Sequence, residues 1–264
     1  MDLGLKDKVA VVAAASRGLG RAVAEALADE GARVAICARN PARLEATAAE
    51  IRQRTGADVL AQPADVTRPD QVHHFVAQAR ARWGSIHICV VNAGGPPAKE
   101  FSAITLDDWQ HAIALNLMSA VYFAREVLPQ MRQQKWGRLI FMTSVAVKQP
   151  IDGLLLSNAV RSAVIGLAKT LANECARDNV LVNTVCPGYT LTERLEELVA
   201  AQAAQKNIPK EEIYNTWKAQ IPLGRLAQPH EFGTVVAFLA SEKASYITGT
   251  SVVIDGGWVR SLLA

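Results

Sequence analysis

Short apolar runs alternate along this chain with longer segments in which apolar residues recur every three or four positions. The short runs predict strands at residues 9–13, 34–37, 59–61, 86–92, 138–143 and 180–186. The longer segments predict helices at residues 18–30, 41–54, 71–83, 106–131 and 157–178. Because the strands are apolar at nearly every position, helices are expected to cover both faces of their sheet, as in parallel sheets. Residues 1–264 are therefore expected to form one α/β domain, a doubly wound parallel sheet of the Rossmann-like type.

Residues 190–221 interrupt this alternation. Leu195 and Trp217 are mixed there with charged residues such as Lys206 and Glu211, and no strand pattern appears. One interpretation is a pair of amphipathic helices fixed to the surface. The other is a helical, lid-like substrate segment over the carboxyl edge of the sheet, where ligands bind in folds of this class. Both interpretations fit the composition, so both stay open.

Composition and charge exclude several classes of protein. Half of the residues are apolar and 20% are charged, which excludes a disordered or fibrous chain. The 28 Lys and Arg residues against 25 Asp and Glu residues leave a formal net charge of +3 without a basic block, so no nucleic-acid partner is expected. The charged residues 1–8 do not resemble a signal peptide, and no apolar run reaches the roughly 18 residues of a membrane span. A cytoplasmic protein without a membrane partner is expected.

The four cysteines, Cys37, Cys89, Cys175 and Cys186, form no Cys-x-x-Cys pair and lie in apolar surroundings. They are expected to be buried free thiols of a protein in a reducing compartment. The five histidines show no spacing that is typical of metal ligands, so no metal site is expected.

The residues that join the first strand to the first helix, Ala13 to Gly20, contain the glycines of a phosphate-binding turn. Glycines here let the backbone approach a pyrophosphate, and the start of a helix supplies N–H groups and the positive end of its dipole. Alone, a Gly-x-Gly pair after a strand is a weak signal, since glycine has structural uses in tight turns. The predicted cofactor-binding residues of this loop are Ala14, Ser16, Arg17, Gly18, Leu19 and Gly20.

Arg39 lies 19 residues after Gly20 and just past the second predicted strand, where an acidic residue would bind a free ribose 2′-hydroxyl. An arginine at this place instead accommodates a 2′-phosphate, and Arg17 supplies a second cation. Either arginine alone could be an ordinary surface charge. Together, with no acid at Cys37 or Ala38, they favour NADP(H) over NAD(H).

Further landmarks follow the glycine loop in order: Ala64-Asp65-Val66, Val91-Asn92-Ala93-Gly94, Asn116, Thr143-Ser144, Pro187-Gly188, Ile247-Thr248-Gly249 and Asp255-Gly256-Gly257. With this ordered set, the chain resembles the short-chain dehydrogenase/reductase family, including its 3-oxoacyl reductases, from about Leu5 to Trp258. The resemblance implies a Rossmann-like sheet and nicotinamide chemistry on the alcohol or carbonyl group of a small molecule. It also implies a homotetramer or a homodimer.

The resemblance assigns contacts to a bound dinucleotide as well. The implied residues are Asp65 at the adenine amine, Asn92, Ala93 and Gly94 at the adenosine ribose, and Pro187, Gly188 and Thr190 at the nicotinamide amide, with Val66 and Thr192 as further cofactor-binding residues. Asp65 has an alternative interpretation as a helix cap. The chain departs from the family at Ala13-Ala14, where Thr-Gly is usual. A positive φ at an alanine costs about 1 kcal/mol, and a negative φ costs nothing, so weakened or unchanged cofactor binding is expected.

Four side chains organise the reaction in this family: a Ser that holds the carbonyl oxygen, a Tyr that donates the proton, a Lys that acidifies the Tyr and binds the ribose, and an Asn that holds a relay water. By the resemblance, Ser144 matches the Ser and Asn116 matches the Asn. The places of the Tyr and the Lys are taken by Ser157 and Arg161, in a helix segment that otherwise fits the family closely.

The missing phenol changes the expected chemistry. An aliphatic alcohol is a far weaker acid than a phenol, so reaching the alkoxide of Ser157 costs about 7–8 kcal/mol more. Arg161 stays protonated and cannot shuttle a proton, but it keeps a positive charge and can donate hydrogen bonds to the ribose hydroxyls. Positions 157 and 161 share one helix face. The structural alternative is a serine at a helix start and an arginine on the surface.

Proton supply therefore needs another source. The candidates are a water held by Asn116 and Ser157, the Lys148 ammonium, and the Tyr189 hydroxyl beside the nicotinamide edge. Lys148 has an alternative interpretation as a solvated loop residue, and Tyr189 as a packing residue under the lid-like segment. A second Tyr-x-x-x-Lys match, at residues 214–218, lies in the lid-like segment without a preceding strand-end serine and is interpreted as coincidence.

Three functions are open on this evidence. The preferred one is an NADP(H)-dependent oxidoreductase that acts on a carbonyl or secondary alcohol, in which Ser144 polarises the carbonyl group and a non-standard donor supplies the proton. The alternatives are a catalytically impaired NADP(H)-binding regulatory or scaffold protein, and a nucleotide-binding lyase or epimerase. The sequence names no particular substrate.

Overall fold

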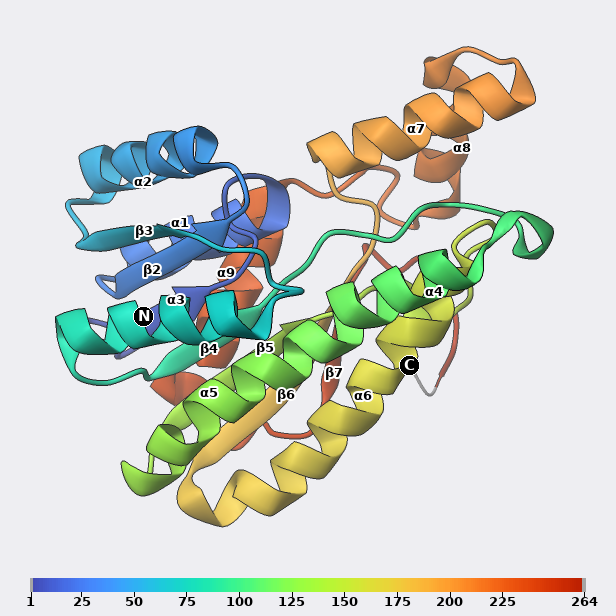
Figure 1. Cartoon of the computed structure of the whole chain (residues 1–264). Coiled ribbons are helices and arrows are strands. Elements are labelled where there is room, and N and C mark those ends of the chain that lie inside the picture. Colours follow the sequence, from blue (N-terminus) through green and yellow to red (C-terminus); the bar gives the residue numbers. More distant parts are fainter. Residues whose placement is uncertain (1, 263–264) are drawn as a thin grey trace.

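The computed structural model describes residues 2–262 as layers of helices on a seven-stranded sheet (Figure 1). All neighbouring strands are parallel, in the order β3-β2-β1-β4-β5-β6-β7. The strands are β1 (Val9–Val12), β2 (Arg33–Ala38), β3 (Val59–Pro63), β4 (Ile88–Val91), β5 (Gly137–Met142), β6 (Val180–Pro187) and β7 (Ser251–Ile254). The doubly wound parallel sheet predicted from the apolar runs is confirmed.

Helices cover both faces of the sheet. One face carries α3 (Pro69–Trp83), α5 (Ser119–Gln133) and α6 (Leu155–Cys175), and the other carries α1 (Gly18–Asp29), α2 (Pro41–Thr55) and α9 (Pro229–Ala240). Phe75, Phe123 and Val164 belong to one buried apolar cluster, and Leu27 and Phe232 belong to a second on the opposite face. Because both faces are covered, β1, β4 and β5 are buried at every residue, which explains their continuous apolar sequence.

The strand order positions the site. The chain leaves β1 for β2 on one side, and β4 later pairs with β1 on the other side. In open α/β sheets this reversal leaves a crevice at the carboxyl ends of the strands, where ligands bind. The loops that follow β1, β4, β5 and β6 all begin at this edge of the sheet. They carry residues 13–17, 92–100, 143–154 and 188–192.

Two regions differ from the elements predicted by pattern. The helix predicted at 106–131 consists of α4 (Leu106–Ala112), a π-helical turn at Ile113–Met118, and α5. The π turn was not predicted because its apolar residues continue the helical pattern without a break. β7 was not predicted either, since it is a four-residue strand that pairs only with β6. α9 was also not predicted. Single 3₁₀ turns lie at Phe101–Ala103, Val145–Val147, Ala176–Asp178 and Glu242–Ala244.

The predicted lid-like segment, 190–221, forms α7 (Glu193–Lys206) and α8 (Lys210–Gln220), which project from the layers in Figure 1. Leu195, Val199 and Trp217 from these helices pack with Trp258 in an apolar cluster separate from those on the sheet. A helical pair agrees with both interpretations of this segment. Movement of the pair as a lid stays a prediction.

The cysteines are all buried and free, as predicted. Among residues 2–262, no group of three or more His, Cys, Asp or Glu side chains could hold a metal ion. The same described residues include no helix that is both long enough and apolar enough to cross a membrane.

Candidate active site

The glycine loop packs tightly between β1 and α1. A Cβ atom at Gly20 would lie 2.4 Å from the carbonyl oxygen of Ala14 and 2.8 Å from Nδ2 of Asn92, so only glycine fits there. Asn92 Nδ2 donates a hydrogen bond of 3.2 Å to the Ala14 oxygen and holds the loop in place. Arg17 at the N-cap forms no capping side-chain hydrogen bond, and the first turn of α1 contains no acidic residue. The start of this helix is therefore suited to an anion.

Ala14 adopts a φ of +49°, in the left-handed region. The negative φ that would have carried no penalty is thus excluded. The neighbouring Gly18 also has a positive φ, of +56°, which glycine adopts without strain. The alanine in this turn is therefore strained by about 1 kcal/mol relative to glycine.

Arg17 and Arg39, the predicted phosphate-binding arginines, differ in their surroundings. Arg17 forms ion pairs with Glu193, at 2.5 Å, and with Glu197, at 3.5 Å, both on α7. Arg39 is exposed and forms no ion pair with any residue between 2 and 262. Arg39 also influences Asp65. Burial alone would raise the pKa of Asp65, but the hydrogen bonds from Thr67 and the positive charge of Arg39 outweigh this effect and lower it.

The residues predicted at the adenine lie in the loop after β3. Asp65 Oδ1 accepts hydrogen bonds from the backbone N–H of Thr67, at 2.9 Å, and from its hydroxyl, at 2.8 Å. Asp65 therefore stabilises this turn, but the N-cap residue of α3 is Arg68, so the alternative of a helix cap at Asp65 is wrong. Val66 is buried in the apolar cluster under α3. Contact of Asp65 with an adenine, and of Val66 with the cofactor, stays a prediction.

The residues predicted at the nicotinamide follow β6. A Cβ at Gly188 would lie 2.7 Å from Cβ of Asp255, so the glycine is needed for packing. Thr190 is buried, and its hydroxyl donates a hydrogen bond of 3.3 Å to the Gly188 oxygen. Thr192 is the N-cap of α7, and its side chain lies 3.5 Å from the position of a Cβ at Gly18. The loop after β6 thus meets the glycine loop directly.

Ser144 lies just beyond β5, at the start of the 3₁₀ turn Val145–Val147. Its Oγ accepts a hydrogen bond of 3.1 Å from the backbone N–H of Ala146. The side chain is half-buried. Because the Ala146 amide uses only a lone pair of the oxygen, the hydroxyl hydrogen of Ser144 is free to donate to a substrate oxygen.

Ser157 and Arg161 lie one turn apart on α6 and are 7% and 8% exposed. The Arg161 guanidinium donates hydrogen bonds to the backbone oxygens of Met142 at 3.1 Å, Thr143 at 3.2 Å, Gly94 at 3.2 Å and Ala93 at 3.5 Å. The alternative of a surface arginine is therefore wrong. In the structure both terminal nitrogens join the ends of β4 and β5, and hydrogen bonds from Arg161 to a ribose stay a prediction.

Arg161 brings a buried positive charge without a carboxylate partner among the described residues. Burial, helped by the like charge of Arg194, lowers the pKa of Arg161 to about 10. The guanidinium is still protonated at neutral pH. Its field therefore favours negative charge that develops on a bound oxygen.

Asn116 lies in the π turn, opposite Arg161. Its Nδ2 donates a hydrogen bond of 3.1 Å to the Gly94 oxygen, while Oδ1 is buried without a partner in residues 2–262. Asn116 and Arg161 also line a cavity of about 10 Å³, which is the size that one water molecule requires. Ser157 does not line this cavity, so a water held by both Asn116 and Ser157 stays a prediction.

The two alternative proton donors differ in their packing. The Tyr189 ring stacks on Trp217, with ring centroids 4.4 Å apart, and meets Trp258 edge-on. Burial raises the pKa of Tyr189, so its phenol releases a proton less readily. Lys148 is half-buried and forms no ion pair with the residues that the structure describes. Burial raises the pKa of Cys186, and the positive charge of Lys148 counteracts part of this rise. Lys148 therefore lies near Cys186 on β6.

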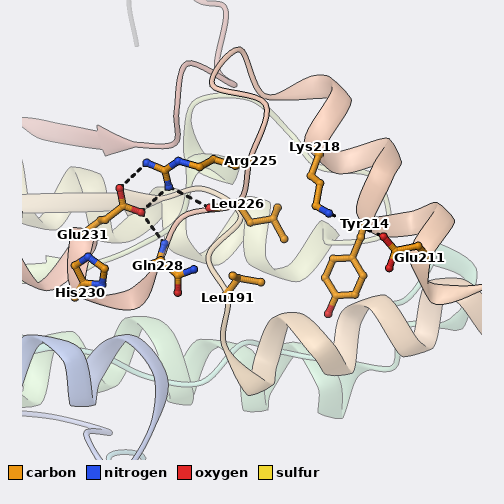
Figure 2. A pocket seen from close by; sticks show the side chains of 9 residues that line it. All are labelled: Leu191, Glu211, Tyr214, Lys218, Arg225, Leu226, Gln228, His230 and Glu231. Atoms are coloured by element: carbon orange, nitrogen blue, oxygen red, sulfur yellow. Dashed lines mark hydrogen bonds and ion pairs between the residues drawn. The ribbon is translucent and has the colours of Figure 1, made fainter.

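Tyr214 and Lys218, the second Tyr-x-x-x-Lys match, lie on α8. They line an open cavity of about 620 Å³ together with Leu191 and the ion pair of Arg225 and Glu231 (Figure 2). None of the predicted catalytic residues lines this cavity.

Charged residues that were not predicted gather at the mouth of the crevice. Arg43, in the first turn of α2, forms an ion pair with Glu193, which also binds Arg17. Arg194 donates a hydrogen bond of 2.9 Å to the Pro96 oxygen. The only sequence signal for Arg43 was its place four residues after Arg39, at the start of the predicted helix 41–54.

Comparisons with known proteins agree on one family. The model of a family described as enoyl-(acyl carrier protein) reductase matches residues 13–259. A 3-oxoacyl-[acyl-carrier-protein] reductase from Aquifex aeolicus is 34% identical, over 97% of this chain and 99% of its own length. The chain belongs to the short-chain dehydrogenase/reductase family.

Other short-chain dehydrogenases and reductases extend the likeness. D-beta-hydroxybutyrate dehydrogenase from Rhizobium meliloti is 32% identical, over 95% of this chain and 98% of its own length. The crystal structure of L-sorbose reductase from Gluconobacter frateurii, in complex with NADPH and L-sorbose, has a TM-score of 0.94 and 32% identity, covering 99% of this chain and 100% of that one. The family predicted from the landmarks is confirmed. The replacement of the Tyr and Lys by Ser157 and Arg161 stays a prediction.

Proposed function

We propose that this protein is an NADP(H)-dependent oxidoreductase that interconverts a carbonyl compound and a secondary alcohol with a non-standard proton donor. Membership of an oxidoreductase family supports the reaction class. The hypothesis of an atypical proton donor rests on the burial of Ser157 and Arg161. Both lie on the face of α6 that meets the ends of β4 and β5. α6 contains no tyrosine, so no phenol can reach the substrate from this helix.

The chain's residues fit a dinucleotide with a 2′-phosphate. The uncapped start of α1 and the close packing at Gly20 suit a pyrophosphate. Arg17 and Arg39 lie at the ends of β1 and β2, where the 2′-phosphate would bind. The L-sorbose reductase structure contains NADPH, which supports the same choice here. When bound, the nicotinamide supplies or accepts the hydride.

Ser144 and Arg161 would act on the substrate oxygen. The Ser144 hydroxyl donates to the carbonyl oxygen, and the hydrogen bond from Ala146 to its Oγ strengthens that donation. The buried charge of Arg161 stabilises the alkoxide that develops as the carbonyl is reduced. Ser157 is too weak an acid to replace the phenol, so it orients the substrate or a water by hydrogen bonding.

Lys148 is the strongest candidate for the proton donor. A lysine ammonium can donate a proton, as the phenol that this chain lacks on α6 would. Lys148 follows Ser144 in the same loop. It forms no ion pair with residues 2–262 that would hold its side chain away from the site. Tyr189 is less favourable because its stacking on Trp217 and its burial make it a poorer acid. A water beside Asn116 is the third source.

The test is NADPH oxidation with a panel of ketones, 3-oxoacyl thioesters and sugars, followed by substitution of each donor. Lys148→Met is expected to lower kcat about 100-fold, whereas Tyr189→Phe changes it less than threefold. Binding of NADPH, measured by calorimetry, stays unchanged in both variants. No turnover of any compound by a wild-type protein that binds NADPH would contradict the oxidoreductase.

One observation favours the second candidate, a regulatory or scaffold protein that binds NADP(H) without turnover. Both terminal nitrogens of Arg161 donate to backbone oxygens, so the residue at the family's lysine position acts as a brace. If this candidate holds, Ser157→Tyr combined with Arg161→Lys creates activity that the wild type lacks. A wild type that turns over, with a lower rate in the double variant, excludes it.

A further inference from the structure

Two arginines share one carboxylate at the mouth of the crevice. Glu193 accepts a hydrogen bond of 2.5 Å from Arg17 through Oε2 and a second hydrogen bond from Arg43 through Oε1. Arg17 also lies 3.5 Å from Glu197. The three residues come from separate elements, since Arg17 immediately precedes α1, Arg43 lies in the first turn of α2, and Glu193 begins α7. The carboxylate therefore ties α7 to the loops that follow β1 and β2.

A carboxylate between two guanidinium groups occupies the kind of site that a phosphate monoester takes. Both anions present paired oxygens, and arginine binds both with the same fork of N–H donors. A phosphate monoester carries up to two negative charges against the one of a carboxylate, so it binds such a pair more strongly. The side chains of Arg17, Arg43 and Glu193 are each 43–46% exposed, so the pairing is weak enough to exchange.

We infer that Arg43 is an additional ligand of the 2′-phosphate and that Glu193 competes with that phosphate for Arg17 and Arg43. This inference rests on the proposed function, because it needs NADP(H) at the crevice. Glu193 is then an internal occupant of the 2′-phosphate site. Cofactor with the phosphate displaces it, whereas NAD(H) leaves it in place.

The displacement also concerns α7. Its first turn is held by Glu193 and by the Thr192 cap, and its next turn packs into the apolar cluster through Leu195 and Val199. When the phosphate takes both arginines, the first turn of α7 keeps its cap and loses its ion pairs to α1 and α2. Binding of NADP(H) is therefore coupled to the mobility of this helix, and the coupling is absent with NAD(H).

Calorimetry of the full chain with NADP⁺ and with NAD⁺ tests the inference at low salt, where ion pairs are least screened. Glu193→Gln is expected to tighten NADP⁺ binding about two- to fivefold, because a competing exposed ion pair is removed. Arg43→Gln is expected to weaken NADP⁺ binding about fivefold. Both variants change NAD⁺ binding less than twofold. Glu196→Gln is the matched control, since Glu196 lies in the same turn of α7 without an ion pair to residues 2–262.

A second measurement follows α7 directly. Hydrogen exchange of the backbone amides of residues 194–199 is expected to rise when NADP⁺ binds and to stay unchanged with NAD⁺. Unchanged NADP⁺ affinity in both Glu193→Gln and Arg43→Gln overturns the inference and leaves the proposed function intact. A wild type that binds neither nucleotide overturns the proposed function itself.

Discussion

Asn116 and Arg161 donate hydrogen bonds to the same carbonyl oxygen, that of Gly94, at 3.1 and 3.2 Å. The two donors come from the π turn and from α6, so the oxygen joins both elements to the loop after β4. Arg161 also reaches the end of β5. The ends of the paired strands β4 and β5 are thus joined by side chains that the family resemblance assigns to chemistry.

The first prediction concerns this brace. Arg161→Met removes the guanidinium group that donates hydrogen bonds to four backbone oxygens in a buried region. Relief from burying a charge offsets part of the loss, so the free energy of unfolding is expected to fall by about 2 kcal/mol. Urea denaturation measures it. Arg177→Met, at an exposed residue without an ion pair to the described chain, is expected to change stability by less than about 0.5 kcal/mol. Equal stability of the two variants would show that the brace contributes nothing.

The second prediction concerns the strained turn at Ala14. Because its φ is +49°, Ala14→Gly relieves a left-handed alanine and is expected to stabilise the fold by about 0.5–1 kcal/mol. Ala46→Gly, at an exposed position inside α2, is expected to destabilise the fold by about 1 kcal/mol. Urea denaturation compares them. Destabilisation by both substitutions would contradict strain at Ala14.

The third prediction concerns the substrate oxygen. Ser144→Ala removes the hydroxyl that would donate to the carbonyl and is expected to lower kcat by about 100- to 1,000-fold. NADPH affinity is expected to stay within twofold, because Ser144 holds only the Ala146 amide within the loop. Steady-state kinetics and calorimetry make the comparison. Ser162→Ala, an exposed serine on α6 that bonds the Asn158 oxygen, serves as control. A Ser144→Ala variant with wild-type kcat would remove this residue from the reaction.

The fourth prediction is a pH dependence at the start of α9. Hydrogen bonds from Arg225, followed by that from the Gln228 amide, lower the pKa of Glu231 from 4.5 to about 2. A carboxyl group whose pKa is lowered by folding stabilises the fold at pH values above its ordinary pKa. This contribution is lost as the pH falls toward 2. The midpoint of thermal unfolding of Glu231→Gln is therefore expected to lie below that of the wild type at pH 6 and to match it near pH 2.

Glu30→Gln provides the control for this profile, since Glu30 forms no ion pair among residues 2–262. Its midpoint is expected to follow that of the wild type across the whole pH range. A difference between Glu231→Gln and wild type that stays constant from pH 6 to pH 2 would contradict the assigned role.

The apolar pattern by itself determined the class of fold. Six of the seven strands and the helices from α1 to α6 follow from runs and periods that each lie within a few residues of sequence. The ordered landmarks identified the family for the same reason, because each is a short local motif. The pattern did not reveal β7, a four-residue strand that pairs only with β6, or the π turn, whose apolar residues continue the helical pattern, and α9 was not predicted either.

Only the tertiary structure decided which polar groups meet. Arg161 lies 67 residues from Gly94 in sequence, and Glu193 lies 150 residues from Arg43, yet each pair is in contact. Such contacts depend on how the loops after different strands converge at one edge of the sheet. Hydrophobic periodicity records which side of an element is buried, but it does not record the partner of a polar side chain. The sequence therefore placed Arg161 on the site face of its helix, and the packing of β4 against β5 decided that it braces the backbone there.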